Sequence, residues 1–109
     1  FIFPHDIIVA YLLWVTIHAT WAHCNFRPTI QWLEPFVVQP RFHHWHHTAQ
    51  PEAIDKNFAI HFPWIDRIFG TYYFPKDGSW PATYGLHQQE FPKGFWAQNL
   101  YPFRRRKPG

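Results

Sequence analysis

The longest apolar run of the chain lies close to its first residue. Residues 7–22, IIVAYLLWVTIHATWA, contain no carboxylate, lysine or arginine, and they are apolar apart from two threonines and His18. A run of this length predicts a helix, with Pro4 as an early breaker and Asp6 as its N-cap. A bilayer span needs about 20 apolar residues, and this run is a little shorter. The helix is therefore either embedded in a membrane, in whole or at its end, or buried in a soluble core. We expect the membrane-embedded alternative.

Shorter elements follow, with boundaries set mainly by prolines. Residues 29–39 are interrupted by Pro35 and predict a short amphipathic helix followed by an extended apolar turn. Pro40 occupies a favoured first position for a second helix, which then carries the histidine-rich stretch 42–48. The polar residues 49–56 predict a loop.

The second half of the chain shows weaker patterns. Residues 57–69 predict a further helix that ends at Gly70, and residues 71–85 predict short strands and turns around the Asp-Gly pair at 77–78. From residue 87 onward we expect an irregular tail. The predicted fold class is therefore mainly α: a membrane-embedded helix, histidine-bearing cytosolic helices, a short strand and turn segment, and an irregular C-terminal tail.

Composition narrows the class of protein. The chain has 109 residues, enough for one domain, with 22% aromatic and 16% charged residues. This balance argues against disorder and suits contact with lipid, where Trp and Tyr gather at the interface. Cys24 is the only cysteine, which excludes a disulfide-stapled secreted domain. The basic run at 104–107 suits anionic lipid or the cytoplasmic side, and no nucleic-acid recognition motif accompanies it.

The stretch FHHWHHT at 42–48 carries the most specific chemistry. On a helix, His43, His46 and His47 stand at i, i+3 and i+4 and share one face, whereas His44 is turned about 100° from His43. Converging neutral imidazoles are typical ligands of Zn, Fe, Cu or Ni. The alternative is an exposed polar helix face, which the large apolar neighbours of these histidines disfavour.

Two further histidines, His18 and His23, lie near the end of the first apolar helix. Their i, i+5 spacing lets both serve one site only if that site holds two metals or the helix unwinds before His23. Either one could instead be an ordinary histidine of a helix end. The remaining isolated histidines, which are His5, His61 and His87, are interpreted as ordinary core or surface residues.

Few carboxylates accompany these histidines. Asp55 and Asp66 are of interest because metal-bound imidazoles commonly donate their second N–H to a carboxylate or a carbonyl. Asp66 has an alternative role in a salt bridge with Arg67 or Arg41, or in capping. Motifs for nucleophilic catalysis, phosphate loops and dinucleotide binding are absent from the sequence.

The ordered set of motifs resembles the C-terminal part of the fatty acid hydroxylase and sterol desaturase superfamily, and more narrowly its bacterial sterol-desaturase-like branch. The resemblance covers roughly residues 16–86. The motifs that carry it are HCN at 23–25, QPRFHHWHH at 39–47, DKNFAIHFPWIDRIFGTYYFP at 55–75 and WPATYGL at 80–86.

This resemblance implies a helical integral membrane enzyme of the bacterial inner membrane or endoplasmic reticulum, with a metal site on the cytoplasmic side. Two iron ions, with zinc as an alternative, would activate O2 to hydroxylate or desaturate a lipid of the sterol or fatty acyl type. An electron-donor protein, cytochrome b5-like or ferredoxin-like, would supply electrons, and no nucleic acid is involved. The metal ligands implied are His43, His46, His47, His23 and His18, with Asn57 and Asp66 as supporting residues.

The sequence departs from the family pattern in lacking the HxxxH box and the earlier HxxHH box. Residues 1–109 are therefore expected to be the C-terminal part of a single domain whose upstream part is missing, and the fragment alone is expected to be inactive. The alternatives are a degenerate relic or a non-catalytic zinc-binding membrane module. Metal-assisted hydrolysis has less support, because a general base would be needed beside the metals.

Overall fold

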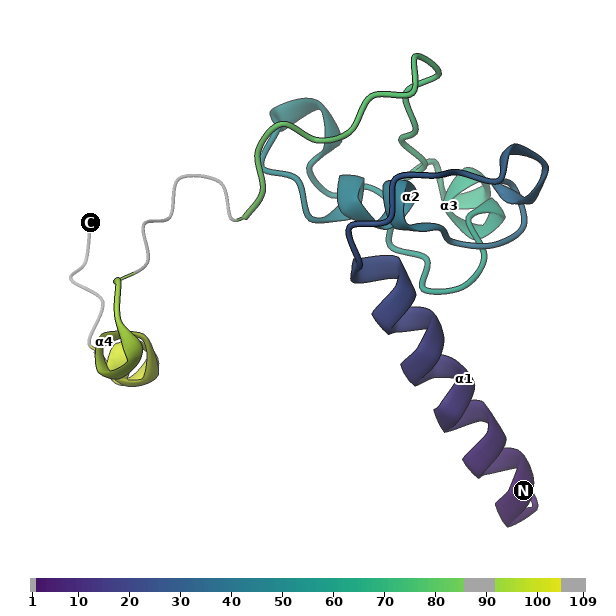
Figure 1. Ribbon diagram of the computed structural model, residues 1–109, viewed down its shortest axis with the longest axis horizontal. Coiled ribbons are helices and arrows are strands. Elements are labelled where there is room, and N and C mark those ends of the chain that lie inside the picture. The colour runs from purple at the N-terminus through teal and green to yellow at the C-terminus, as the bar shows by residue number, and fades with distance from the viewer. Residues whose placement is uncertain (1, 86–91, 105–109) are drawn as a thin grey trace.

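Helices are the only regular elements in the part of the chain that the computed structural model describes, which is residues 2–85 and 92–104 (Figure 1). In chain order they are α1 (His5–His23), the 3-10 helix η1 (Gln31–Leu33), α2 (Pro40–His46), the 3-10 helix η2 (Pro51–Ala53), α3 (Trp64–Phe69), α4 (Phe95–Leu100) and the 3-10 helix η3 (Tyr101–Phe103). The predicted mainly α class is confirmed. His87 and residues 105–107 of the basic run lie outside the described ranges.

The first helix, α1, covers the predicted apolar run and extends it slightly at both ends. Pro4 is its N-cap residue, and no side chain caps the first turn. The prediction that Asp6 caps the helix was wrong, because Asp6 lies inside the first turn, where a carboxylate still favours the helix dipole. The helix ends where Cys24 adopts an extended backbone and donates its N–H to the carbonyl of Trp21.

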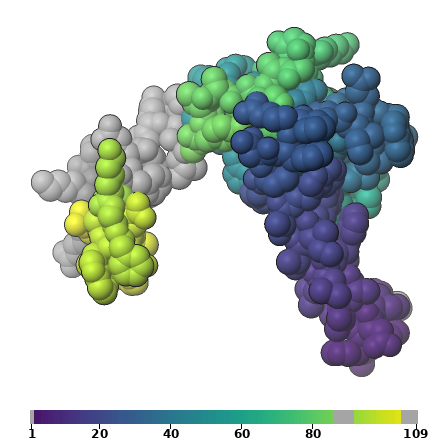
Figure 2. Space-filling model, viewed as in Figure 1, coloured from purple at the N-terminus to yellow at the C-terminus, as the bar shows by residue number. Residues whose placement is uncertain are grey.

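Most of α1 stands clear of the other helices, although Tyr11 and Trp14 contact the His61 ring and the last turns pack more closely. Figure 2 shows the N-terminal half of α1 projecting from the body of the molecule. The side chains of Leu12, Leu13 and Ile17 are exposed. Near its end, His18 and Ala22 are buried. No helix within the described ranges combines the length and apolarity needed to cross a bilayer, so the structure confirms a helix at 7–22 without supporting a span.

The second helix, α2, begins at Pro40 as predicted and packs against the end of α1. Proline suits this first position because its fixed φ is helical and its missing N–H has no partner there in any helix. Phe42 of α2 joins Ala22, Val38 and Ala59 in a small buried core. This core fixes the end of α1 beside α2, which is the arrangement that brings their histidines together.

Two predicted helices are shorter than expected. The helix expected within 29–39 is reduced to the three residues of η1. The helix expected over 57–69 begins only at Trp64, and it ends as predicted at Gly70, whose φ of 71° makes the left-handed cap that glycine favours. Residues 57–63 instead form an irregular segment, because their backbone groups pair with distant residues.

The strands predicted within residues 71–85 are absent from the described chain, and that prediction was wrong. Tyr73 donates its N–H to the side-chain oxygen of Asn57 at 2.8 Å, and Thr71 donates to the backbone carbonyl of Asp66 at 2.8 Å. These backbone groups therefore bond to a side chain and to a carbonyl of α3, and not to a neighbouring strand. The predicted turn does occur, since Ser79 donates its N–H to the Asp77 carboxylate at 2.9 Å.

The C-terminal segment was expected to be irregular, and that expectation was also wrong for residues 95–103. Gly94, with a φ of 97°, precedes α4, and η3 follows α4 directly. Figure 1 shows α4 away from the helices α1, α2 and α3.

Candidate metal centre

Three imidazoles from two elements meet where the end of α1 crosses α2. His23 is the last residue of α1, His43 lies in the middle of α2, and His47 is the C-cap residue that directly follows α2. Their Nε2 atoms are 3.0 Å apart for His23 and His43, 3.0 Å for His43 and His47, and 3.1 Å for His23 and His47. The three nitrogens thus form a nearly equilateral triangle, which we call the three-histidine cluster.

A hydrogen bond within α1 sets the orientation of His23. Its Nδ1 lies 2.7 Å from the carbonyl of Ala19, one turn earlier in the helix. A carbonyl can only accept, so Nδ1 carries the proton and the neutral ring turns the lone pair of Nε2 toward the cluster. This is the carbonyl support that metal-ligating histidines commonly have.

Burial and mutual repulsion keep His43 in its neutral form. Burial is the largest cause, followed by His23 and then the other nearby histidines, and together they lower the pKa of His43 from its usual 6.5 to about 3. The pKa of His47 is also lowered, first by burial and then by His46 and His23. Neutral imidazole is the form that binds a metal, so the cluster is ready for an ion near neutral pH.

The cluster fits a bound cation better than it fits an imidazole network alone. The Nδ1 atom of His43 is buried without a hydrogen-bond partner among the described residues. The three Nε2 atoms of the cluster lie within 3.1 Å of one another. Nitrogens at this spacing can all reach one ion at the usual metal–imidazole distance of about 2.0–2.1 Å. A three-imidazole set suits zinc, iron, copper or nickel.

His46 and His44 lie on α2 but outside the three-histidine cluster. His46 donates from Nδ1 to the carbonyl of Lys56 at 3.0 Å, and its ring centre lies 5.5 Å from that of His43. His44 bonds the carbonyl of Cys24 and the hydroxyl of Tyr84. The structure therefore brings His46 beside the cluster, while His44 points elsewhere, as predicted.

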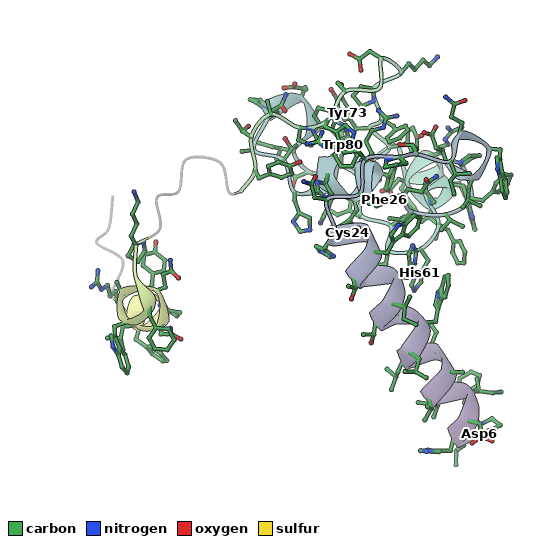
Figure 3. All side chains as sticks on the ribbon, viewed as in Figure 1. Asp6, Cys24, Phe26, His61, Tyr73 and Trp80 are labelled. Carbon is green, nitrogen blue, oxygen red and sulfur yellow. The ribbon has the colours of Figure 1, made fainter. Side chains whose placement is uncertain are left out.

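His18, a predicted ligand, is paired with His61 instead of joining the cluster (Figure 3 labels His61 beside α1). Its Nε2 donates to the carbonyl of Val38 at 2.8 Å, so its Nδ1 accepts from Nδ1 of His61 at 2.7 Å. Five residues of helix place His18 and His23 about 140° apart around α1. The partner role of His61 was missed, because the residue was interpreted as an ordinary core or surface histidine.

Asn57 and Asp66 support the fold around the site and do not contact an imidazole in the described residues. Asn57 donates to the carbonyls of Phe42 and Tyr73, which ties the middle of α2 to the segment after α3. Asp66 accepts backbone N–H groups from Phe58 and Ala59 at 2.9 Å each. The salt bridge considered for Asp66 is not formed, since its carboxylate is used by these amides and by the Thr71 hydroxyl.

Comparison with known protein families identifies the family to which the chain belongs. The fatty acid hydroxylase family matches residues 1–71, a stretch that includes α1, α2 and every residue of the three-histidine cluster. The chain belongs to the fatty acid hydroxylase family. No curated protein and no solved structure matches it. The narrower bacterial sterol-desaturase-like branch stays a prediction, because the match is to the family as a whole.

Membership in the fatty acid hydroxylase family gives the cluster a chemical context. The family supports an oxidoreductase type of enzyme, it is known for the use of iron, and its members are typically associated with membranes. The matched stretch contains the HxxHH motif at 43–47. The cluster is thus a candidate metal centre of a lipid-oxidising enzyme.

A pocket of about 540 Å³ opens beside this fatty acid hydroxylase centre. His46 and His47 form part of its wall, and Ile54 and Phe58 add apolar surface, with the Phe58 ring edge-on to that of His46. This volume is in the range of ordinary small-molecule sites. The pocket therefore places apolar surface directly beside His46 and His47.

The depressed pKa values predict that acid destabilises the metal-free protein. The unfolded chain binds protons with a histidine pKa near 6.5, whereas folded His43 does so only near 3, so lowering the pH through this window favours unfolding. We expect the denaturant midpoint of unfolding to fall between pH 6.5 and pH 4, and to fall less in His43→Gln. An equal fall in both proteins would contradict the assigned burial of His43.

Proposed function

We propose that this protein is an O2-dependent oxidoreductase that hydroxylates or desaturates a C–H bond of a membrane lipid, of the sterol or fatty acyl type. The observation that carries the proposal is the three-histidine cluster, in which His23 meets two histidines that lie 20 and 24 positions later in the sequence, with all three nitrogens within 3.1 Å of one another. The match to the fatty acid hydroxylase family supports the type of reaction.

We assign the first of two iron ions to His23, His43 and His47. His46 borders the same place and is our candidate ligand for the second ion, together with ligands from outside these residues. His18 is left out of the proposed set, because Val38 and His61 engage both of its ring nitrogens. Zinc would satisfy the same imidazoles, so the identity of the ion is part of the proposal.

Iron held by these histidines would supply the activation of O2. The chain itself would position the ligands and provide an apolar wall beside them. The Ala19 carbonyl fixes the ring of His23, and the Lys56 carbonyl does the same for His46. Ile54 and Phe58 line the adjoining pocket, where they would provide apolar contact for an acyl chain or ring system beside the imidazoles.

We further propose that α1 associates with a membrane and that the metal centre lies on the cytoplasmic side. The supporting observation is the exposed apolar surface of α1, which includes Ile8, Leu12 and Leu13 and would be unfavourable in water. A separate donor protein, cytochrome b5-like or ferredoxin-like, is proposed as the source of electrons, since the sequence carries no flavin or haem motif.

The proposal is tested by metal analysis combined with a product assay on the purified full-length protein. We expect iron, and oxidised lipid that forms only when O2 and a reductant are both supplied. His46→Ala is expected to lower the ratio of iron to protein without abolishing metal binding, because the three-histidine cluster remains. Bound zinc with no oxidised lipid would instead favour a structural zinc-binding role, and a protein without metal would contradict both.

A further inference from the structure

A second pocket of about 540 Å³ lies among residues that contribute nothing to the metal centre. It is formed where the segment after α1, the start of α2, the end of α3 and the 72–80 loop come together. The residues that line it are Arg27, Thr29, Gln31, Glu34, Arg41, Arg67, Tyr72, Phe74, Lys76, Gly78 and Trp80. Neither the family match nor the proposed oxidation assigns it a role.

Positive charge dominates this second pocket. Four of its side chains are cationic and only Glu34 is anionic. Glu34 is already engaged, because its carboxylate lies 3.6 Å from Nη2 of Arg41. Arg41 is buried and also donates to the carbonyls of Pro75 and Ser79, so it serves the fold. Three cations, Arg27, Arg67 and Lys76, remain without a carboxylate partner among the described residues.

Two of these cations are held in place by aromatic rings. The guanidinium of Arg27 stacks 4.6 Å from the ring centre of Trp80, and that of Arg67 stacks 4.5 Å from Tyr72, whose hydroxyl it also contacts at 3.3 Å. Stacking uses the face of a guanidinium and leaves N–H groups on its edge available to a ligand. Ordering the side chains in advance lowers the entropic cost of binding.

We propose that this second pocket binds a phosphate group carried by a small molecule or a lipid headgroup. The edge of a guanidinium donates two parallel N–H bonds to phosphate oxygens. Within the described chain, three cations without a salt-bridge partner beside the single Glu34 carboxylate leave the pocket with a net positive charge that favours an anion. Thr29 and Gln31 add polar side chains to the wall. The concave shape favours a compact anion over the acidic surface of a protein, which would meet a flat or convex basic patch.

The test compares two double variants that each remove two positive charges. Arg27→Gln with Arg67→Gln changes the pocket, whereas Lys93→Gln with Arg104→Gln changes described residues that do not line it. The probes are inorganic phosphate, phosphatidylcholine vesicles with or without phosphatidic acid, and polyglutamate. Circular dichroism and metal content check that both variants keep the fold and the metal centre.

We expect the pocket variant to bind inorganic phosphate about tenfold or more weakly than the unchanged protein, and the control variant to bind it within about twofold. Pocket-dependent binding of phosphatidic acid vesicles, with or without binding of free phosphate, also supports the proposal and identifies a lipid source. Equal losses in both variants would overturn it, because the effect would then be general electrostatics. Binding of polyglutamate alone would overturn it in favour of an acidic protein partner.

Discussion

His43→Ala is expected to remove bound metal from the purified protein, with a loss of affinity of at least about 100-fold. Mutation of a residue that only supports a metal ligand typically lowers metal affinity by about 10–100-fold. His43 itself supplies one of the three nitrogens of the cluster, so its loss should cost more. The measurement is metal content by elemental analysis, followed by titration against a competing chelator.

His5→Ala is the matched control for this change. His5 is also a histidine, but it is exposed and lies at the opposite end of α1 from His23. We expect His5→Ala to keep the metal content of the unchanged protein. Equal metal content in His43→Ala and His5→Ala would remove the three-histidine cluster as the binding site.

Ile54→Trp is expected to lower product formation by about 100-fold or more while the metal content stays unchanged. Ile54 lines the pocket beside His46 and His47 without belonging to the cluster, so the larger side chain occupies the space proposed for the lipid. Displacing a substrate by about 1 Å can cost about 100-fold in rate. The readout is the O2-dependent yield of oxidised lipid per bound iron.

Ile60→Trp is the control for the pocket variant. Ile60 is 65% exposed and lies outside the pocket, so the same increase in side-chain size should leave turnover within about threefold. If the two tryptophan variants retained equal turnover, the pocket would not be the lipid site.

Local sequence signals predicted the parts of the fold that depend on a few neighbouring residues. Pro40 begins α2 and Gly70 ends α3, because a ring-fixed φ and a left-handed cap are properties of single residues. The strands expected at 71–85 failed for the opposite reason. Aromatic residues there suit a strand, but the hydrogen bonds of Tyr73 go to the side chain of Asn57, a partner 16 residues away.

The candidate site was likewise predicted where it depends on local spacing and was not predicted where it depends on contacts between distant residues. Spacing in one helix placed His43 and His47 on a common face, and the family resemblance added His23. Helical spacing alone could not show that His46 lies outside the three-histidine cluster. Its ring is oriented by a hydrogen bond to the Lys56 carbonyl, and α2 ends at this residue. The pairing of His18 with His61 depends on a backbone bond from Val38 to the carbonyl of His61, which no periodicity indicates.

The most direct measurement is X-ray absorption spectroscopy at the metal edge of the loaded protein, compared with His23→Ala. We expect outer-shell scattering from imidazole rings, with nitrogens about 2.1 Å from the ion. The substitution at the end of α1 should reduce the number of imidazoles per ion. A spectrum that His23→Ala and His43→Ala both leave unchanged would contradict a centre shared between α1 and α2.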